Sequence, residues 1–422
     1  MNGHSMTKFT SSFMKAFALS AVFAFAGAVS TGAYAADEKK EEPKVSKAVA
    51  KPLKAAQEAL QAKNYPEALA KLQEVQNAPN KTPYDEHVMN ELLGVAYVRQ
   101  SQFTEAAKYL EPGLNDGFLA ESDIPNRVRA LAQVNYQIKN YDKAIEFGNR
   151  AVKGGFADDD MYTLVGQAYY IKGDYKGSEK FLDEYVDSQV KSGKQPKEQT
   201  LQLLMSSCVK LDDANCTTNS LEELVSYYPK TEYWQNLLYS LFQQEGQTDK
   251  SLLHVYRLAS EVDVLKRADD YTEYAQLAIE AGSPGEAVSV LEKGMQKNVF
   301  TDARSADKAK RLLESAKKQA ETDKASLDKV ASDAAAAKTG QKDVGVGLAY
   351  LSYKEYDKAY QAIERGLSKP GVQNEAEAHL LLGIAALGAG KKDDAQKAFK
   401  AVKGDPKLER IANLWSLHAR QA

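Results

Sequence analysis

The chain has few residues of the kinds that build catalytic and metal centres. Its 422 residues include two cysteines, two tryptophans and five histidines. The histidines are isolated and show no His-x-x-x-His or His-x-x-Glu-His spacing, and no Cys-x-x-Cys appears, so the sequence predicts no metal site. A Walker pattern and a Gly-x-Ser-x-Gly pattern are also missing, which gives no reason to expect a bound nucleotide or a serine nucleophile. We therefore expect no cofactor and no enzyme.

Long hydrophobic runs and an excess of one charge are missing as well. The formal net charge of −3 gives no general attraction to nucleic acid or to an anionic membrane. The apolar run over residues 16–28 is shorter than the ~20 residues of a membrane span. It follows Lys8 and Lys15 and precedes Ala33-Tyr34-Ala35, a small-x-small cleavage pattern. We therefore expect a signal peptide over residues 1–35, cleaved after Ala35, a periplasmic protein and no stable membrane insertion.

Residues 36–50 are rich in charge and contain no aromatic side chain. Such a composition buries too little apolar surface to fold alone, so we expect a disordered tether here. Over the full chain, 43% of residues are hydrophobic and 27% are charged, as in ordinary folded proteins.

The rest of the chain repeats one pattern of small residues. A glycine or alanine on an expected first helix is followed twelve positions later by an alanine or serine on a second helix. The seven pairs are Ala56 with Ala68, Gly94 with Ala106, Ala132 with Ala144, Gly166 with Ser178, Ala275 with Ala287, Gly347 with Ala359, and Gly383 with Ala395. Independent helices would not keep a constant offset, so the pattern predicts stacked helical hairpins.

This periodicity predicts an all-α, right-handed superhelical solenoid of about ten helical hairpins with a C-terminal capping helix. Residues 51–300 form the expected N-terminal block, which includes two degenerate units. Residues 301–340 are polar and helical without the small-residue signature, and form either a non-consensus hairpin or one long helix. Residues 341–422 hold further units and an amphipathic last helix that covers the final repeat, since a solenoid needs a polar cap.

Cys208 and Cys216 flank the expected bend of one hairpin. An oxidising compartment favours a disulfide between two such residues, and the hairpin brings the helices that carry them together. The alternative is two small buried thiols that fill helix contacts.

The small and aromatic positions of residues 161–185 (MYTLVGQAYYIKGDYKGSEKFLDEY) resemble those of a tetratricopeptide repeat (TPR). From Leu201 onward, LEELVSYYPKTEYWQNLL and AEAHLLLGIAALGAGKKDDAQKAF resemble bacterial periplasmic TPR proteins associated with TonB–ExbB–ExbD systems. The resemblance implies a protein or peptide partner in the bacterial envelope, with TonB–ExbB–ExbD components as candidates, and implies no catalytic residues.

First helices of such repeats line a concave groove, and the residues beside the small position face it. The expected groove residues are Arg99, Arg129, Gln133, Tyr136, Gln167 and Tyr170. Tyrosine, glutamine and arginine suit an extended or helical peptide, because they stack and form adaptable hydrogen bonds. Alternatively, these side chains are solvated surface or pack on the neighbouring hairpin.

The function that we expect is a periplasmic scaffold or adaptor that binds a protein or peptide in this groove, beside a TonB-type uptake machine or another envelope machine. The alternative is an accessory subunit of envelope polysaccharide or peptidoglycan assembly that holds an enzyme or its polymer product. We expect no nucleic-acid partner.

Overall fold

The computed structural model describes residues 43–244 and 246–421. The expected signal peptide and residues 36–42 of the expected tether lie outside these residues. The described chain consists of α-helices and short 3-10 turns without a strand, and divides into two compact units, unit 1 up to Leu203 and unit 2 from Leu204. None of the described helices is long and apolar enough to cross a membrane.

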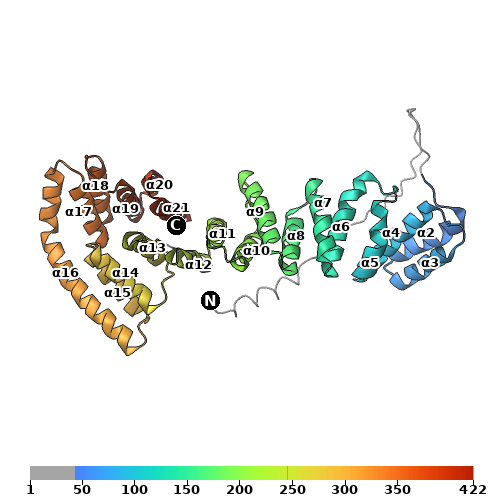
Figure 1. The fold of residues 1–422 in the computed structure, drawn as a ribbon, viewed down its shortest axis with the longest axis horizontal. Coiled ribbons are helices and arrows are strands. Elements are labelled where there is room, and N and C mark those ends of the chain that lie inside the picture. The colour runs from blue at the N-terminus through green and yellow to red at the C-terminus, as the bar shows by residue number, and fades with distance from the viewer. Residues whose placement is uncertain (1–42, 245, 422) are drawn as a thin grey trace. The chain divides into compact units, whose positions relative to one another are not determined.

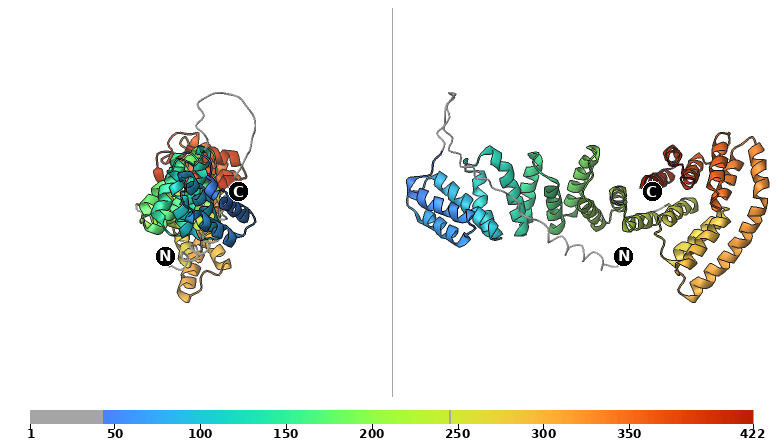
Figure 2. Two further views of the ribbon diagram at one scale, coloured as in Figure 1. Left: turned by 90° about the vertical axis from the view of Figure 1, so that its right-hand side faces the viewer. Right: turned by 180° about the vertical axis from the view of Figure 1, so that it is seen from behind.

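Unit 1 is a row of helical hairpins (Figures 1 and 2). Its helices are α2 (Lys47–Gln61), α3 (Tyr65–Asn77), α4 (Pro83–Arg99), α5 (Phe103–Leu110), α6 (Ile124–Gln137), α7 (Tyr141–Lys153), α8 (Asp159–Lys172), α9 (Tyr175–Lys191) and the start of α10 (Glu198–Lys210). Helix α2 begins inside the segment 36–50 for which we expect a tether. Val49 explains this difference, because it is fully buried and anchors the first turn of α2 in the core of the first hairpin.

The bend of each hairpin has the same backbone conformation. Seven residues after the small first-helix residue, the chain adopts positive φ in all seven consensus units. These residues are Lys63, Ser101, Lys139, Gly173, Gly282, Lys354 and Gly390. In five units the second helix then begins at the turn aromatic, as at Tyr65 and Phe103. The residue in the left-handed conformation ends the first helix and reverses the chain, and the aromatic residue is the first residue of the second helix.

The small residues are explained by the side chain that lies opposite them. A Cβ atom on Gly94 would lie 2.2 Å from Leu110, sixteen residues later, and one on Gly166 would lie 2.5 Å from Leu182. Gly347 meets Ile363 in the same way, and Gly383 meets Phe399. The first helix therefore leaves room for a large side chain of the second, which fills the hairpin core.

Unit 2 contains the remaining hairpins and one exceptional helix. Its helices are the end of α10, then α11 (Ala214–Tyr227), α12 (Thr231–Phe242), α13 (Asp249–Glu261), α14 (Ala268–Glu280), α15 (Pro284–Gln296), α16 (Ala303–Ala336), α17 (Gln341–Ser352), α18 (Tyr356–Leu367), α19 (Glu375–Gly388), α20 (Lys392–Ala401) and α21 (Pro406–Gln421). Of the two alternatives for residues 301–340, the structure has the single long helix. Counted over the described residues, the fold comprises nine hairpins, α16 and α21.

The last helix covers the end of the solenoid, as expected for a cap, and also contacts the beginning of unit 2. Helix α21 packs on α20 and α19 and reaches α13 (Figure 1). Arg410 contacts the Glu222 carboxylate and donates to Asn219 at 3.1 Å, and Gln421 donates to the Val225 carbonyl at 2.9 Å. These contacts join residues almost 200 positions apart, so the helices of unit 2 form a closed arrangement.

Candidate functional site

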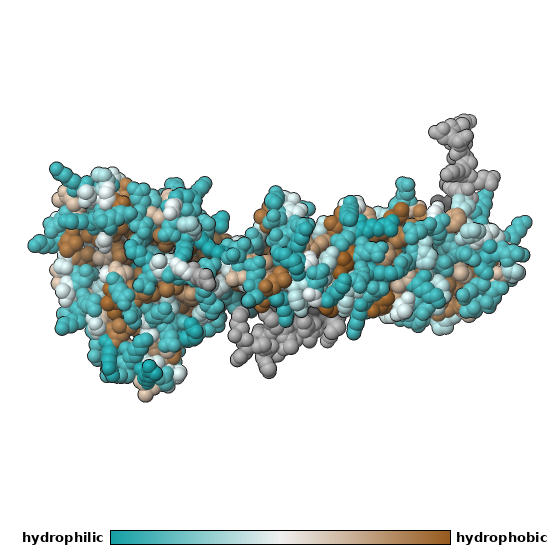
Figure 3. All heavy atoms as spheres, viewed as in Figure 1, coloured by the Kyte–Doolittle hydropathy of each residue, from teal (hydrophilic) through white to brown (hydrophobic). Residues whose placement is uncertain are grey.

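The first helices of unit 1 present equivalent residues to solvent. We call the surface formed by α4, α6 and α8 at the fourth and fifth positions after each small residue the first-helix face. It consists of Val98, Arg99, Tyr136, Gln137, Tyr170 and Ile171. The fourth-position side chains are half-buried and those at the fifth position are exposed. Figure 3 shows hydrophobic residues reaching the surface among polar ones over unit 1.

Two of the expected groove residues are hydrogen-bonded to each other. The Tyr136 hydroxyl on α6 donates a 3.0 Å hydrogen bond to the Gln167 side-chain carbonyl on α8. Gln167 is only 8% exposed. Burial raises the pKa of Tyr136 to about 12, with a smaller contribution from Tyr141. The expectation that Gln167 lies open to a ligand is corrected, because its amide is already engaged with the neighbouring repeat.

The other expected groove residues differ in how free they are. Arg129 donates to Asn126 at 2.8 Å and lies 3.4 Å from the Asp158 carboxylate, which caps α8. Gln133 is half-buried. Arg99 is exposed at the end of α4 and forms no ion pair with any carboxylate in the described part of the chain. Arg99 is therefore the more available of the two arginines.

Tyr170 remains a candidate contact, and the structure adds a neighbour that sequence reasoning missed. The Tyr170 ring lies edge-on to Tyr175, with ring centroids 5.1 Å apart, which fixes its orientation. Ile171, the next residue, is 52% exposed. Ile171 follows Gly166 at the same spacing at which Arg99 follows Gly94, so the repeat spacing in the sequence could have identified it. An exposed isoleucine beside a fixed tyrosine is a surface suited to an apolar anchor.

The two cysteines lie in unit 2, away from this face in sequence. Cys208 on α10 and Cys216 on α11 are joined by a disulfide, and their Cα atoms are 5.4 Å apart. Asp213 caps α11 by accepting from the Cys216 backbone N–H at 2.9 Å. The bridge therefore ties the two helices of one hairpin at its bend.

Unit 2 also contains a buried network of charged residues. Arg257 on α13 donates two 2.8 Å hydrogen bonds to Glu286 on α15, which also accepts a 2.7 Å bond from the Tyr274 hydroxyl. His254 lies 3.3 Å from the Arg257 guanidinium and 3.6 Å from the Glu377 carboxylate on α19. A buried charge must be paired to be tolerated, so the network links α13, α15 and α19. It contains no exposed nucleophile, and we interpret it as structural.

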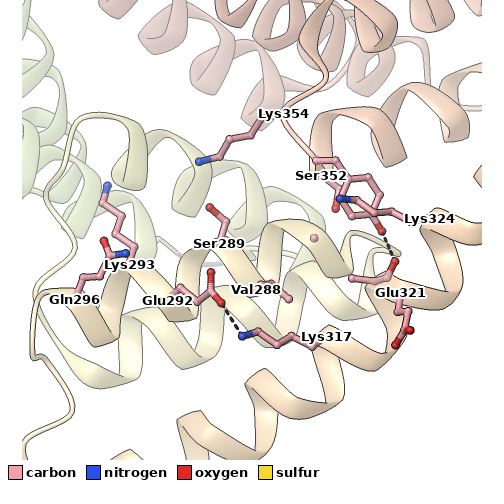
Figure 4. A pocket seen from close by; sticks show the side chains of 13 residues that line it. Val288, Ser289, Glu292, Lys293, Gln296, Lys317, Glu321, Lys324, Ser352 and Lys354 are labelled. Atoms are coloured by element: carbon pink, nitrogen blue, oxygen red, sulfur yellow. Dashed lines mark hydrogen bonds and ion pairs between the residues drawn. The ribbon is translucent and has the colours of Figure 1, made fainter.

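An open cleft of about 700 Å³ lies between α15, α16 and the bend that joins α17 to α18 (Figure 4). Its lining combines an apolar part, Val288, Ala320 and the Tyr353 ring, with polar groups at the rim. Four lysines line it, Lys293 from α15, Lys317 and Lys324 from α16 and Lys354 from the bend, together with Glu292 and Glu321. The repeat pattern in the sequence does not mark this cleft, because α16 lacks the small-residue signature.

Among the residues that the structure describes, no three histidine, cysteine, aspartate or glutamate side chains are grouped as metal ligands.

Comparison with known families finds a match to the first repeats of unit 1. The tetratricopeptide repeat model matches residues 53–114 and 91–161, which lie in unit 1. Comparison with curated proteins finds no match.

Solved structures of helical-repeat proteins are similar at low identity. A tetratricopeptide repeat protein from Parabacteroides merdae is 13% identical, over 64% of this chain and 99% of that chain, with a TM-score of 0.32. The C-terminal part of a TPR repeat-containing protein from Cytophaga hutchinsonii is 12% identical, over 75% of this chain and 95% of that chain, with a TM-score of 0.31.

Proposed function

We propose that this tetratricopeptide-repeat protein is a scaffold that holds an extended or helical segment of a protein partner on the first-helix face of unit 1. Tetratricopeptide repeats mediate protein–protein interaction and typically carry no catalytic residues. The observation that carries the proposal is the regular row of half-buried and exposed side chains on α4, α6 and α8. Tyr170 and Ile171 would supply apolar anchors, and Arg99 a charged contact at the other end.

We further propose that the protein acts in the periplasm, beside a TonB-type uptake machine. Two sequence features support this placement. The first is the short apolar run before Ala35, which has the form of a cleavable signal peptide. The second is the resemblance of the chain from Leu201 onward to periplasmic proteins associated with TonB–ExbB–ExbD. N-terminal sequencing of protein purified from the periplasm should begin at Ala36, and an intact N-terminus would contradict export by this signal.

The partner proposal is tested with a double variant of the first-helix face. We expect the full chain to co-purify with ExbB–ExbD–TonB components, and Tyr170→Ala with Ile171→Ala to reduce their recovery at least about tenfold, as loss of interface anchors does. The matched control is Lys180→Ala with Glu184→Ala, two exposed positions on α9. Equal recovery with both double variants would show that the first-helix face is not the binding surface.

A polysaccharide-binding assay separates this proposal from the alternative role in envelope polymer assembly. A protein adaptor should not bind purified peptidoglycan or envelope polysaccharide. If the purified chain binds either polymer and the Tyr170→Ala, Ile171→Ala variant weakens that binding, the accessory role in polymer assembly replaces the adaptor role.

A further inference from the structure

We propose that the cleft between α15, α16 and the α17–α18 bend is a second binding site, distinct in its residues from the first-helix face, which takes an acidic peptide segment of a protein partner. The segment's carboxylates would contact Lys324 and Lys354, and its apolar side chains would lie on Val288, Ala320 and the Tyr353 ring. Three properties of the cleft support this assignment: how it forms, which of its charges are free and what kind of chain they fit.

The cleft exists because one helix departs from the repeat pattern. Helix α16 has 34 residues, whereas α15 has 13, so α16 continues beyond the hairpin partner that a repeat would supply. It packs on α14, α15, α17 and α18 but leaves a groove between its own side chains and those of α15. Residues 317, 320, 321 and 324 of α16 and residues 288, 289, 292 and 296 of α15 line its two walls.

The side of the cleft formed by the α17–α18 bend is held in place by hydrogen bonds. The Ser352 hydroxyl accepts a 3.0 Å bond from the Glu286 backbone N–H at the start of α15. The Tyr353 hydroxyl lies 2.6 Å from the Asp323 carboxylate and 3.2 Å from the Ala320 carbonyl, both on α16. The Tyr353 ring is therefore fixed between the bend and α16 before any ligand arrives, which lowers the entropic cost of binding.

Two of the four lysines already have partners. Lys317 forms a 2.8 Å ion pair with Glu292 across the cleft (Figure 4). Lys293 lies 2.9 Å from the Asp263 carboxylate and donates a 2.9 Å bond to the Ser260 carbonyl. These contacts join the walls of the cleft to each other, to the end of α13 and to the loop that follows it.

The other two lysines can meet a ligand. The Lys324 ammonium lies over the Tyr353 ring, 4.7 Å from its centroid. Lys354 follows Tyr353 and is exposed. Neither lysine is within 4 Å of a carboxylate in the described residues, although Lys354 is near enough to Glu261 to contribute to the lowered pKa of that carboxyl, behind the larger effect of His418. Two ammonium groups without a carboxylate partner in the described chain thus line the cleft, and one of them, that of Lys324, lies over the Tyr353 ring.

The mixture of charges indicates what kind of chain fits. Glu292 and Glu321 lie in the same lining as the lysines, so a uniformly charged polymer such as nucleic acid would set phosphates beside carboxylates. A peptide can place a carboxylate at each free lysine and neutral groups elsewhere. Ser289, Gln296 and the apolar lining then supply hydrogen bonds and contact area along the peptide. The charge arrangement therefore favours an acidic peptide with interleaved apolar residues.

The experiment uses the full chain and a fluorescein-labelled peptide of alternating aspartate and leucine, followed by fluorescence anisotropy. Alternating asparagine–leucine and lysine–leucine peptides are the controls for charge. We expect the acidic peptide to bind and the other two to bind at least about tenfold more weakly. Lys324→Glu with Lys354→Glu should weaken the acidic peptide by at least about tenfold.

A matched variant separates the cleft from the general charge of the protein. Lys318→Glu with Lys329→Glu changes the net charge equally on α16, at exposed positions outside the cleft lining. This variant should leave binding within about twofold, because exposed charges at a distance are screened. Thermal unfolding of both variants checks that each is folded. Equal loss in the two variants, or equal binding of the asparagine–leucine peptide, would overturn the proposal.

Two competing ligand classes are tested in the same assay. Phosphatidylglycerol vesicles and a single-stranded oligonucleotide should neither bind the cleft nor displace the acidic peptide. Displacement by either one, sensitive to Lys324→Glu with Lys354→Glu, would assign the cleft to a lipid surface or nucleic acid instead. The Tyr170→Ala, Ile171→Ala variant should bind the acidic peptide as the native chain does. The two proposals use different residues, so a failure of the cleft proposal leaves the proposed function of unit 1 unaffected.

Discussion

The hydroxyl of Tyr136 donates to the side-chain carbonyl of Gln167 across two neighbouring repeats, over 3.0 Å. The bond links α6 to α8, on the side of the hairpins where a ligand would be expected. Both residues are thereby part of the solenoid's own structure, so a change at either one alters repeat stacking as well as any surface they present.

We predict that Tyr136→Phe lowers the free energy of unfolding by about 1–2 kcal/mol, because it leaves the buried Gln167 acceptor without its donor. The matched control is Tyr170→Phe, since the Tyr170 hydroxyl makes no hydrogen bond to the described residues, and it should stay within about 0.5 kcal/mol of the native chain. Urea unfolding followed by circular dichroism measures both. Equal effects of the two changes would show that the hydrogen bond does not stabilise the repeat junction.

The hairpin bends provide a second prediction, in which a substitution raises the free energy of unfolding. Lys139 has a φ of +62°, a conformation that costs a residue with a Cβ about 1 kcal/mol and costs glycine little. We expect Lys139→Gly to raise the free energy of unfolding by roughly 0.5–1 kcal/mol after the entropy of glycine is allowed for. Glu146→Gly, at an exposed position inside α7, should instead lower it by about 1 kcal/mol. A loss of stability with Lys139→Gly would contradict backbone strain at this bend.

The repeat spacing in the sequence predicts the hairpins well but not the contacts between them. The twelve-residue offset between Gly166 and Ser178 marks a close crossing, and the Ser178 hydroxyl indeed donates to the Gly166 carbonyl at 3.0 Å. The partner of Gly166 at Leu182 follows the same register in other units. Contacts inside one repeat join residues at a fixed, short spacing. The same spacing recurs in each unit, so it can be recognised in a single sequence.

Contacts between distant segments leave no such repeated signal. Nothing near Gln167 in the sequence indicates that its acceptor is satisfied from Tyr136, and nothing in the polar sequence of α16 indicates a cleft against α15. The contact of Arg410 with Glu222 joins residues 188 positions apart and occurs once. Because each of these contacts occurs once, no repeated spacing in the sequence indicates which two residues come together.

The disulfide gives a prediction that needs no ligand. With Cys208 and Cys216 bridged, thiol blocking without reductant should label neither cysteine, as mass spectrometry can show. A bridge that closes so short a loop restricts the unfolded chain, so Cys208→Ala with Cys216→Ala should lower the free energy of unfolding by about 2–3 kcal/mol. The reduced native chain should match this variant. Two labelled thiols in protein from the periplasm would contradict the bridge.

The buried His254 makes stability depend on pH. Burial lowers its pKa from the usual 6.5, because the surrounding helices exclude the water that would solvate the charged ring. The guanidinium of Arg257, 3.3 Å away, acts in the same direction, whereas Glu377 on α19 opposes it. Arg257 can only donate, so it donates to Nδ1, and the ring proton lies on Nε2, toward Glu377.

The direction of the pH dependence follows from the difference between the pKa of His254 in the folded chain and in the unfolded chain. The unfolded chain takes up a proton at His254 as pH falls through 6.5, and the folded chain does so only at lower pH. Stability contributed by neutral His254 is therefore present above pH 6.5 and is lost as the pH falls below it, by at most about 1.4 kcal/mol per pH unit.

The variant that checks this dependence is His254→Gln, which keeps an acceptor for Arg257 and removes the titration. Urea unfolding at about pH 8 and about pH 5 measures the free energy of unfolding of both proteins. The difference in favour of the native chain should become smaller as the pH falls. The comparison at each pH cancels the titrating groups that His254 does not influence, such as His379, because both proteins contain them. A native advantage that grows toward pH 5 would mean that protonated His254 is stabilised by Glu377 more than it is penalised by burial and by Arg257.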